Sequence, residues 1–218
     1  MVAEGATRGA EGPDRHADGH ARPRIGVLGG TFDPPHVGHV AAAAAARDEL
    51  GLDRVLLVVA NDPWQKSPSR SITPAEDRFA LVEAAVSGLE GVEASRLELD
   101  RGGPSYSIDT VEALRAGVLG EPADVVLIVG ADLVATLPTW ERAAELAKLA
   151  TLAVVARPGS PDVRRASGWH VLTVDGPSLD VSSSELRERL VHGEDVEGLV
   201  PDPVMRCIRA RHLYAVGR

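Results

Sequence analysis

The sequence predicts a doubly wound α/β fold, in which helices cover both faces of a mostly parallel β-sheet. Short apolar runs rich in β-branched residues alternate along the chain with segments of helical spacing. The run at residues 24–28, the helical segment at 40–50 and the run at 55–60 together form one βαβ unit. Ligands of such sheets bind at the carboxyl ends of the strands, so the residues that follow each run are the first candidates for a site.

Six apolar runs predict the strands of this sheet. Most of them end at glycine, proline or polar residues, as buried strands do, and the third run alternates between apolar and polar residues. The runs cover residues 24–28, 55–60, 92–99, 125–129, 151–156 and 169–174.

The segments between these runs predict the helices. The helix at 40–50 contains six consecutive alanines, which favour a helix and let its axis lie close to the sheet. Thr73 is predicted as the N-cap of a helix that reaches about residue 86, with Pro74 at its first position. Ser182 and Glu185 form a capping-box pattern that opens a further helix. The remaining predicted helical ranges are 107–114, 140–150, 186–191 and 203–213.

The 218 residues predict a single domain with one appendage. Residues 1–23 lack any periodicity and are expected to be a disordered tail, so that the domain covers residues 24–218. The tail carries His16 and His20, and metal binding by these two residues stays open as an alternative.

The bulk composition excludes several classes of protein. The net charge of −9 argues against a protein that coats nucleic acid and against a polybasic membrane patch. The single cysteine, Cys207, cannot form an internal disulfide or a thiolate zinc site, which favours a cytoplasmic location. No apolar run reaches the ~20 residues of a membrane span, so no membrane partner is expected.

The turn after the first run is the strongest candidate for a functional site. Gly29, Gly30, Thr31 and Phe32 lead to His36 and His39, which are three residues apart. If the helix starts near residue 37, both imidazoles share the face of its first turn, where unsatisfied N–H groups and the helix dipole favour an anion. This order of strand, glycine turn, histidines and helix predicts a site for nucleotide phosphate.

Two features of this turn allow other interpretations. Asp33, His36 and His39 could hold a metal, but no further ligand stands at a recognisable spacing, so no protein metal site is expected. Gly38 removes a side chain where a flat base or sugar could lie, and simple flexibility at the start of the helix is the alternative.

Other candidates follow later strands. The loop that carries Trp64 and Lys66 comes after the second run, and Gly130 with Asp132 comes after the fourth. Because the carboxyl ends of parallel strands share one edge, these residues are expected to converge on one site.

Several motifs resemble those of a known family. The segment 29–39 resembles the first signature of the HIGH-type nucleotidylyltransferase superfamily, and 182–187 resembles its Ser-Ser/Thr-x-x-Arg motif. Residues 103–110, 130–132 with Trp140, and 155–159 resemble those of bacterial nicotinate-nucleotide adenylyltransferases, a similarity that spans about residues 24–214. The resemblance implies a Rossmann-like nucleotidyltransferase fold.

The resemblance also implies a reaction, in which ATP and nicotinate mononucleotide give deamido-NAD and pyrophosphate. It implies Mg²⁺ carried largely by the phosphates, with His36, His39, Arg187 and Lys66 in catalysis. The ATP site it implies also includes the residues of the glycine turn and of the later strand ends: Gly29, Gly30, Thr31, Phe32, Gly38, Gly130, Asp132, Arg157, Ser182 and Ser183.

For the acceptor, the resemblance implies Tyr106 and Trp140 as flat surfaces for the pyridine ring and Ser107 as a donor to its carboxylate. Asp109 is expected to orient this loop. The chain departs from the family at residues 64–66, where Trp-Gln-Lys replaces the usual Pro-His-Lys, so the role of Lys66 stays open against that of a solvated cation.

Alternatives remain at this point. The first is another adenylyltransferase of the superfamily, whose acceptor is nicotinamide mononucleotide or pantetheine phosphate. The second is a non-catalytic nucleotide-binding protein. The sequence leaves the oligomeric state open, a homo-oligomer included.

Overall fold

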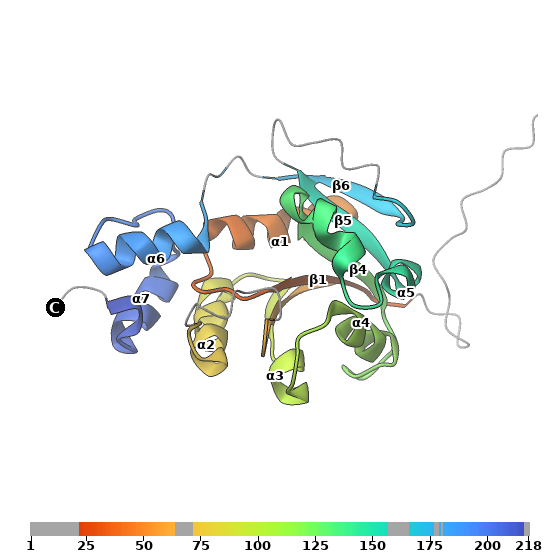
Figure 1. The fold of residues 1–218 in the computed structure, drawn as a ribbon, viewed down its shortest axis with the longest axis horizontal. Helices are drawn as coiled ribbons and strands as arrows, with labels where there is room; N and C mark the ends of the chain where they lie inside the picture. Colours follow the sequence, from red (N-terminus) through yellow and green to blue (C-terminus); the bar gives the residue numbers. More distant parts are fainter. Residues whose placement is uncertain (1–21, 64–71, 157–165, 177–178, 180, 216–218) are drawn as a thin grey trace, which may run out of the picture.

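The computed structural model describes residues 22–63, 72–156, 166–176, 179 and 181–215. Its centre is one sheet of six parallel strands in the order β3-β2-β1-β4-β5-β6 (Figure 1). The predicted doubly wound fold is confirmed, and within the described residues every strand pair of the sheet is parallel. The order reverses between β1 and β4, which is where such sheets bind nucleotides. The strands are β1 (Arg24–Gly30), β2 (Arg54–Val59), β3 (Val92–Ser95), β4 (Asp124–Gly130), β5 (Ala150–Ala156) and β6 (Val171–Asp175).

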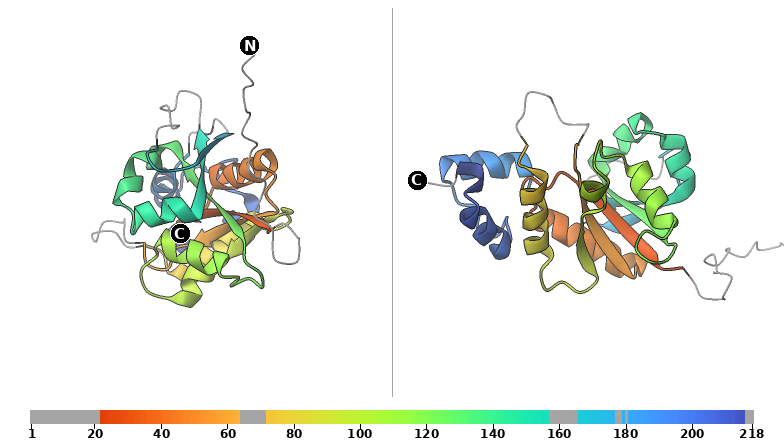
Figure 2. Two further views of the ribbon diagram at one scale, coloured as in Figure 1. Left: turned by 90° about the vertical axis from the view of Figure 1, so that its right-hand side faces the viewer. Right: turned by 90° about the horizontal axis from the view of Figure 1, so that it is seen from below.

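Helices cover both faces of the sheet (Figure 2). Successive residues of a strand point to opposite faces, and the buried side chains accordingly form two apolar clusters. One cluster joins the strands to α1 and α2, and the other joins them to α4 and α5. The helices are α1 (Val37–Leu50), α2 (Ala75–Val86), α3 (Leu97–Arg101), α4 (Ser107–Arg115), α5 (Ala143–Leu149), α6 (Ser183–His192) and α7 (Asp202–Ala210), with the 3₁₀ helices η1 (Ala131–Thr139) and η3 (Leu213–Ala215).

A third apolar cluster lies at one end of the molecule. It joins α2 to α6 and α7, which lie side by side beyond α2 (Figures 1 and 2). α7 carries its apolar residues on one side, and Val204 and Ile208 are fully buried there. This packing brings η3 close to the turn that follows β1, where Tyr214 is hydrogen-bonded to Asp33.

Several predicted boundaries were wrong. The strand expected over 92–99 ends at Ser95, because Arg96 leaves the extended conformation, with φ −91° and ψ 3°, and serves as the N-cap of α3. The helix expected from Trp140 begins only at Ala143, because Arg142 lies in the left-handed region with φ 49°. Alternating apolar residues fit a strand or a short helix equally well, and sequence spacing does not reveal a left-handed residue.

The predicted cap of α2 was also displaced by one position. Pro74 occupies the N-cap itself, and no side chain among the described residues caps this helix. Ser182 does cap α6 as predicted, since its hydroxyl accepts a hydrogen bond from the Glu185 N–H at 3.2 Å. Of the predicted disordered tail, residues 1–21 lie outside the described residues.

Candidate active site

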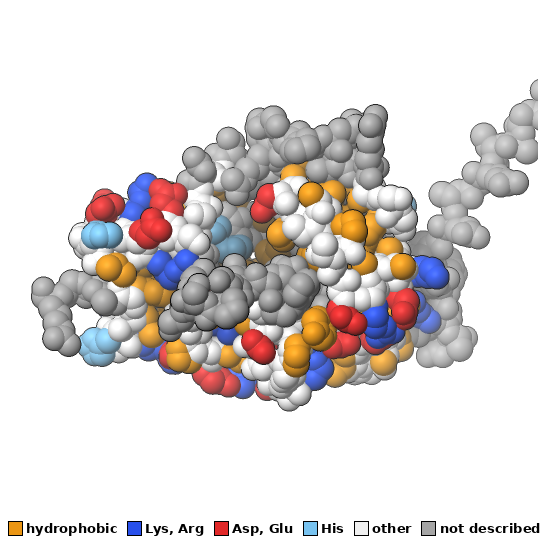
Figure 3. All heavy atoms as spheres, viewed as in Figure 1, with side chains coloured by type: hydrophobic (Ala, Val, Ile, Leu, Met, Phe, Trp, Pro, Cys, Tyr) orange, Lys and Arg blue, Asp and Glu red, His pale blue; other side chains and the backbone are white. Residues whose placement is uncertain are grey.

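A cavity of about 920 Å³ opens at the carboxyl ends of β1 and β4. It is lined by the turn after β1, the starts of α1, α4 and α6, and the residues that follow β4. Figure 3 shows this face hollowed, with histidine atoms visible inside the hollow. Its volume lies within the range of small-molecule sites, roughly 300–1,000 Å³.

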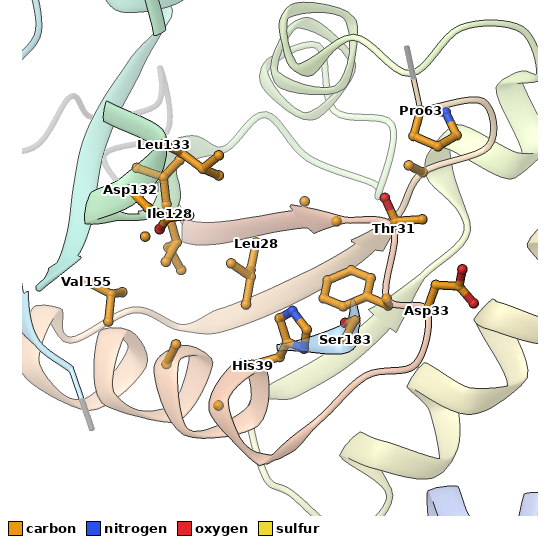
Figure 4. Close-up of a pocket in the computed structure, with 18 of the residues that line it drawn as sticks. Leu28, Thr31, Asp33, His39, Pro63, Ile128, Asp132, Leu133, Val155 and Ser183 are labelled. Atoms are coloured by element: carbon orange, nitrogen blue, oxygen red, sulfur yellow. The ribbon is translucent and has the colours of Figure 1, made fainter. Parts of the chain in front are cut away.

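The turn after β1 places two histidines at the start of α1. The side chain of Phe32 is buried, and its backbone lies in the left-handed region with φ 50°. His36 is the N-cap of α1 and His39 lies in its first turn. Their rings stack with centroids 3.7 Å apart, which confirms the prediction that both imidazoles share one face. Figure 4 shows His39 rising from α1 toward the cavity.

The environment of His39 determines which of its two ring nitrogens carries the proton. The His36 backbone N–H donates to Nδ1 of His39 at 3.2 Å. Desolvation and the neighbouring His36 hold the pKa of His39 well below its ordinary value. At neutral pH the ring is therefore neutral, and with Nδ1 as the acceptor its proton lies on Nε2. The imidazole of His39 therefore offers one N–H donor, at Nε2, and carries no charge.

Two glycines of the site allow close approach of other side chains. A Cβ on Gly38 would lie 3.0 Å from Nδ1 of His36 and 3.2 Å from Val181. A Cβ on Gly130 would lie 2.5 Å from Oδ1 of Asp132. Each glycine makes room for a polar group that lines the cavity.

Helix α6 is tied to the same turn across a large separation in sequence. The Ser183 hydroxyl donates to the Pro34 carbonyl at 2.8 Å. Nη1 of Arg187 donates to the carbonyl of Asp33, and its Nη2 donates to the Ser184 hydroxyl at 2.9 Å. The N-termini of α1 and α6 thus face one cavity, with a guanidinium beside them, which is an arrangement suited to a polyanion.

The opposite wall carries aromatic and hydroxyl groups. Tyr106 is the N-cap of α4, and Ser107 is the first residue of that helix. Trp140 follows η1, and its ring N–H donates to the Thr136 hydroxyl at 3.1 Å, which holds the indole in place. Three of the four residues predicted for the acceptor line the cavity, and Asp109 is the exception.

Most of the predicted site residues come together here. The following predicted residues line the cavity: Gly29, Gly30, Thr31, Phe32, His36, Gly38, His39, Tyr106, Ser107, Gly130, Asp132, Trp140, Ser182, Ser183 and Arg187. Asp109 lies in the first turn of α4 and is absent from the described lining. Lys66, Trp64 and Arg157 lie outside the described residues.

The structure brings in residues that sequence reasoning did not single out. Glu98 is buried in the cavity wall, where its carboxylate accepts from the Thr110 hydroxyl at 2.7 Å. Tyr214 donates a hydrogen bond to Asp33, and Arg78 is buried beneath the turn. The sequence contained a signal for Arg78. Leu81 and Val82 follow it by three and four residues, which places Arg78 on the apolar side of α2.

The described part of the chain holds no cluster of potential metal ligands. No three His, Cys, Asp or Glu side chains there are placed to hold one ion. None of the described helices is long and apolar enough to cross a membrane.

Comparisons with known proteins agree with this geometry. Residues 27–189 match the family model described as cytidylyltransferase-like. The chain is 40% identical to a probable nicotinate-nucleotide adenylyltransferase of Corynebacterium kroppenstedtii, over 88% of this chain and 91% of that protein. It is 42% identical to one of Streptomyces coelicolor, over 86% of this chain and 98% of that protein.

A solved structure has the same fold. It is the Plasmodium falciparum nicotinic acid mononucleotide adenylyltransferase complexed with APC, which superposes with a TM-score of 0.71. The two chains are 15% identical, and the match covers 89% of this chain and 98% of the other. From the family model and the two bacterial relatives, the chain belongs to the cytidylyltransferase-like family and, within it, to the nicotinate-nucleotide adenylyltransferases.

Proposed function

We propose that this protein transfers the adenylyl group of ATP to nicotinate mononucleotide, which yields deamido-NAD and pyrophosphate in NAD biosynthesis. The observation that carries the proposal is the juxtaposition of two walls in one cavity. The N-termini of α1 and α6 face a wall with Tyr106, Ser107 and Trp140. One wall suits a triphosphate and the other suits a flat, anionic acceptor.

The chemical step needs no base from the protein. A phosphate monoester has its second pKa near 6, so the attacking oxygen of the mononucleotide is largely ionised at neutral pH. That oxygen forms a bond to the α-phosphorus of ATP, and the bond from the α-phosphorus to the bridging oxygen of the β-phosphate breaks. Pyrophosphate leaves with the electron pair. The protein's contribution is alignment and the stabilisation of charge.

His39 and Arg187 supply that stabilisation. The proton on Nε2 of His39 is available to a phosphoryl oxygen, because Nδ1 already accepts from His36. Arg187 stands beside the first N–H groups of α6, those of Ser183 and Ser184, which have no acceptor within the helix. We assign the transferring phosphoryl group to His39 and the β and γ phosphates to Arg187 and α6.

Mg²⁺ fits this site only as a partner of the phosphates. The described side chains proposed for the phosphates carry imidazole, hydroxyl and guanidinium groups, which suit anions better than Mg²⁺. The carboxylate of Asp33 also belongs to the lining, but it accepts a hydrogen bond from Tyr214. Bound to ATP, Mg²⁺ would neutralise charge on the leaving pyrophosphate. The residues of this chain then bind the remaining oxygens and orient them.

The acceptor wall provides a stacking surface and donors. Trp140 is held by Thr136 and faces the cavity, so its indole can stack on the pyridine ring. Ser107 and nearby N–H groups at the start of α4 are proposed for the nicotinate carboxylate. Asp132 is proposed as a ligand of a ribose hydroxyl. The resemblance adds Lys66 as a phosphate contact and Arg157 as a residue of the ATP site.

We also propose that the enzyme works in the cytoplasm as one domain from residue 24 onward. Cys207 is a free thiol that packs against the third apolar cluster, which is compatible with a reducing compartment.

One assay separates the candidates. The purified chain is mixed with ATP, Mg²⁺ and, in turn, nicotinate mononucleotide, nicotinamide mononucleotide or pantetheine phosphate, and pyrophosphate release is followed. The highest kcat/KM is expected with nicotinate mononucleotide. A higher value with the amide would overturn the acceptor assignment, and no release with any acceptor would indicate a binding protein.

A further inference from the structure

Arg78 is a buried charge that the proposed chemistry leaves unused. Its side chain is 1% exposed, which makes it the least exposed charged residue among the described ones. Burial lowers the pKa of Arg78, and the charge of Asp33 opposes that effect. An arginine remains charged even so, and burying that charge is unfavourable unless its donors find acceptors.

The donors of Arg78 go to backbone carbonyls of three separate segments. Nη1 donates to the carbonyl of Thr31 at 2.8 Å, and Nη2 lies 3.4 Å from that of Asn61. Nε donates to the carbonyl of Thr73 at 2.7 Å. These carbonyls belong to the turn after β1, the loop after β2 and the segment before α2. One rigid guanidinium therefore fixes the relative positions of all three.

Asn61 continues this connection to the acceptor side. Its side-chain amide donates to the Gly103 carbonyl at 2.9 Å, and its backbone N–H donates to the Ser105 hydroxyl at 2.8 Å. Next to it, Asp62 pairs with Pro104 in a short parallel bridge. Ser105 lies directly before the Tyr106 and Ser107 segment that lines the cavity.

We propose that Arg78 and Asn61 are positioning residues that hold the ATP turn after β1 in register with the acceptor loop before α4. Neither residue is part of the described cavity lining, so both act through the segments they bind. The proposal rests on the proposed function for the identity of the two substrates. The Arg78–Asn61 link, as we call these two residues and their hydrogen bonds, spans the two walls.

In-line transfer makes this register important. Each substrate binds mainly to one wall, whereas the distance between the attacking oxygen and the α-phosphorus depends on both. A misplacement of 1 Å between reacting groups costs about 100-fold in rate. Loosening the Arg78–Asn61 link should therefore lower kcat and leave the KM of each substrate nearly unchanged.

The first test compares two neighbouring alanine variants. Asn61→Ala removes the donor to Gly103, and Asp62→Ala changes the exposed side chain beside it while keeping its backbone bonds. We expect Asn61→Ala to lower kcat about 10-fold, part of the cost of a full misplacement, with both KM values within about 2-fold of wild type. Asp62→Ala should retain wild-type kcat. Equal kcat in the two variants, or a raised KM with unchanged kcat for Asn61→Ala, would overturn the proposal.

The second test uses Arg78→Lys and the double variant Arg78→Lys/Asn61→Ala. A lysine keeps the charge but has no planar fork for carbonyls of separate segments. Because the two residues act in one link, the double variant should lose no more activity than the less active of the two single variants. Additive losses of activity would contradict the link. If Arg78→Lys does not fold, the Asn61 comparison decides alone.

Amide hydrogen exchange supplies a readout that is independent of turnover. Exchange at the amides of Gly103, Ser105 and Tyr106 should be faster in Asn61→Ala than in Asp62→Ala, because the acceptor loop loses an anchor. Unchanged exchange there would defeat the link whatever the enzyme's acceptor is. A wild-type chain that shows no activity with nicotinate mononucleotide would defeat the proposed function alone, since the exchange result would still stand.

Discussion

The hydroxyl of Tyr214 donates a hydrogen bond of 2.7 Å to the carboxylate of Asp33, 181 residues away in the sequence. Asp33 is 2% exposed, and its backbone carbonyl accepts from Arg187. The last described 3₁₀ helix of the chain thus packs on the turn that carries the two histidines. Tyr214 thus supports the site from outside the described cavity lining. Figure 4 shows the Asp33 side chain directed away from His39.

Tyr214→Phe should destabilise the protein. The substitution keeps the ring but removes the donor to Asp33, and a buried carboxylate that loses a hydrogen bond costs about 1–3 kcal/mol. The measurement is the midpoint of urea unfolding, read with the slope held to the wild-type value. An unchanged midpoint would show that water or another donor replaces the hydroxyl at no cost.

Alkaline pH should weaken the wild-type protein through the same residue. Burial, together with Asp33, raises the pKa of Tyr214 in the folded state, whereas the unfolded chain titrates near 10. Above about pH 10 the unfolded state therefore binds fewer protons than the folded state, and the free energy of unfolding falls as the pH rises. Tyr214→Phe should show a shallower decline between pH 9.5 and 11, a range set by that reference pKa. Parallel declines would contradict this assignment.

His39→Ala should abolish most of the turnover. Removing one preorganised donor to a developing charge costs about 100- to 1,000-fold in kcat, and the melting temperature should stay near that of the wild type. His170→Ala is the matched control, because His170 lies just before β6, at the opposite edge of the sheet. Comparable kcat values for the two variants would remove His39 from catalysis.

Acid should destabilise the unliganded protein through His39. Desolvation lowers the pKa of His39 in the folded state, with His36 as the second cause, whereas the unfolded chain titrates near 6.5. Below about pH 6.5 the unfolded state binds the additional proton, so the free energy of unfolding falls as the pH falls. His39→Gln should flatten this part of the profile. The measurement is urea unfolding at several pH values between 5 and 7, around that reference pKa, and identical slopes would contradict the prediction.

Trp140→Ala should weaken acceptor binding specifically. Stacking of a base on an aromatic side chain is worth about 1–3 kcal/mol, so the KM for the mononucleotide should rise about 5- to 150-fold while the KM for ATP stays unchanged. Trp140→Phe should recover most of this loss. Trp169→Phe, before β6, serves as the control. An equal rise in both KM values for Trp140→Ala would point to a general role in packing.

The sequence by itself determined the sheet and the turn that carries His36 and His39. Buried parallel strands are two-sided apolar runs, and a helix N-terminus is written in local residues such as Ser182 with Glu185. The order of strand, glycine turn and helix therefore predicted where His36 and His39 would lie, and their ring stacking agrees. These features depend on contacts within a few residues, which local patterns encode.

The tertiary structure alone decided how that site is held. Arg78 and Tyr214 contact the turn after β1 from other elements, and the left-handed Arg142 delays the start of α5 after Trp140. Such contacts depend on the packing of elements that are distant in sequence, so no local spacing predicts them. A buried charge or a buried carboxylate is stable only when the folded chain brings it a partner, and that partner is identified only once the layers of the fold have assembled.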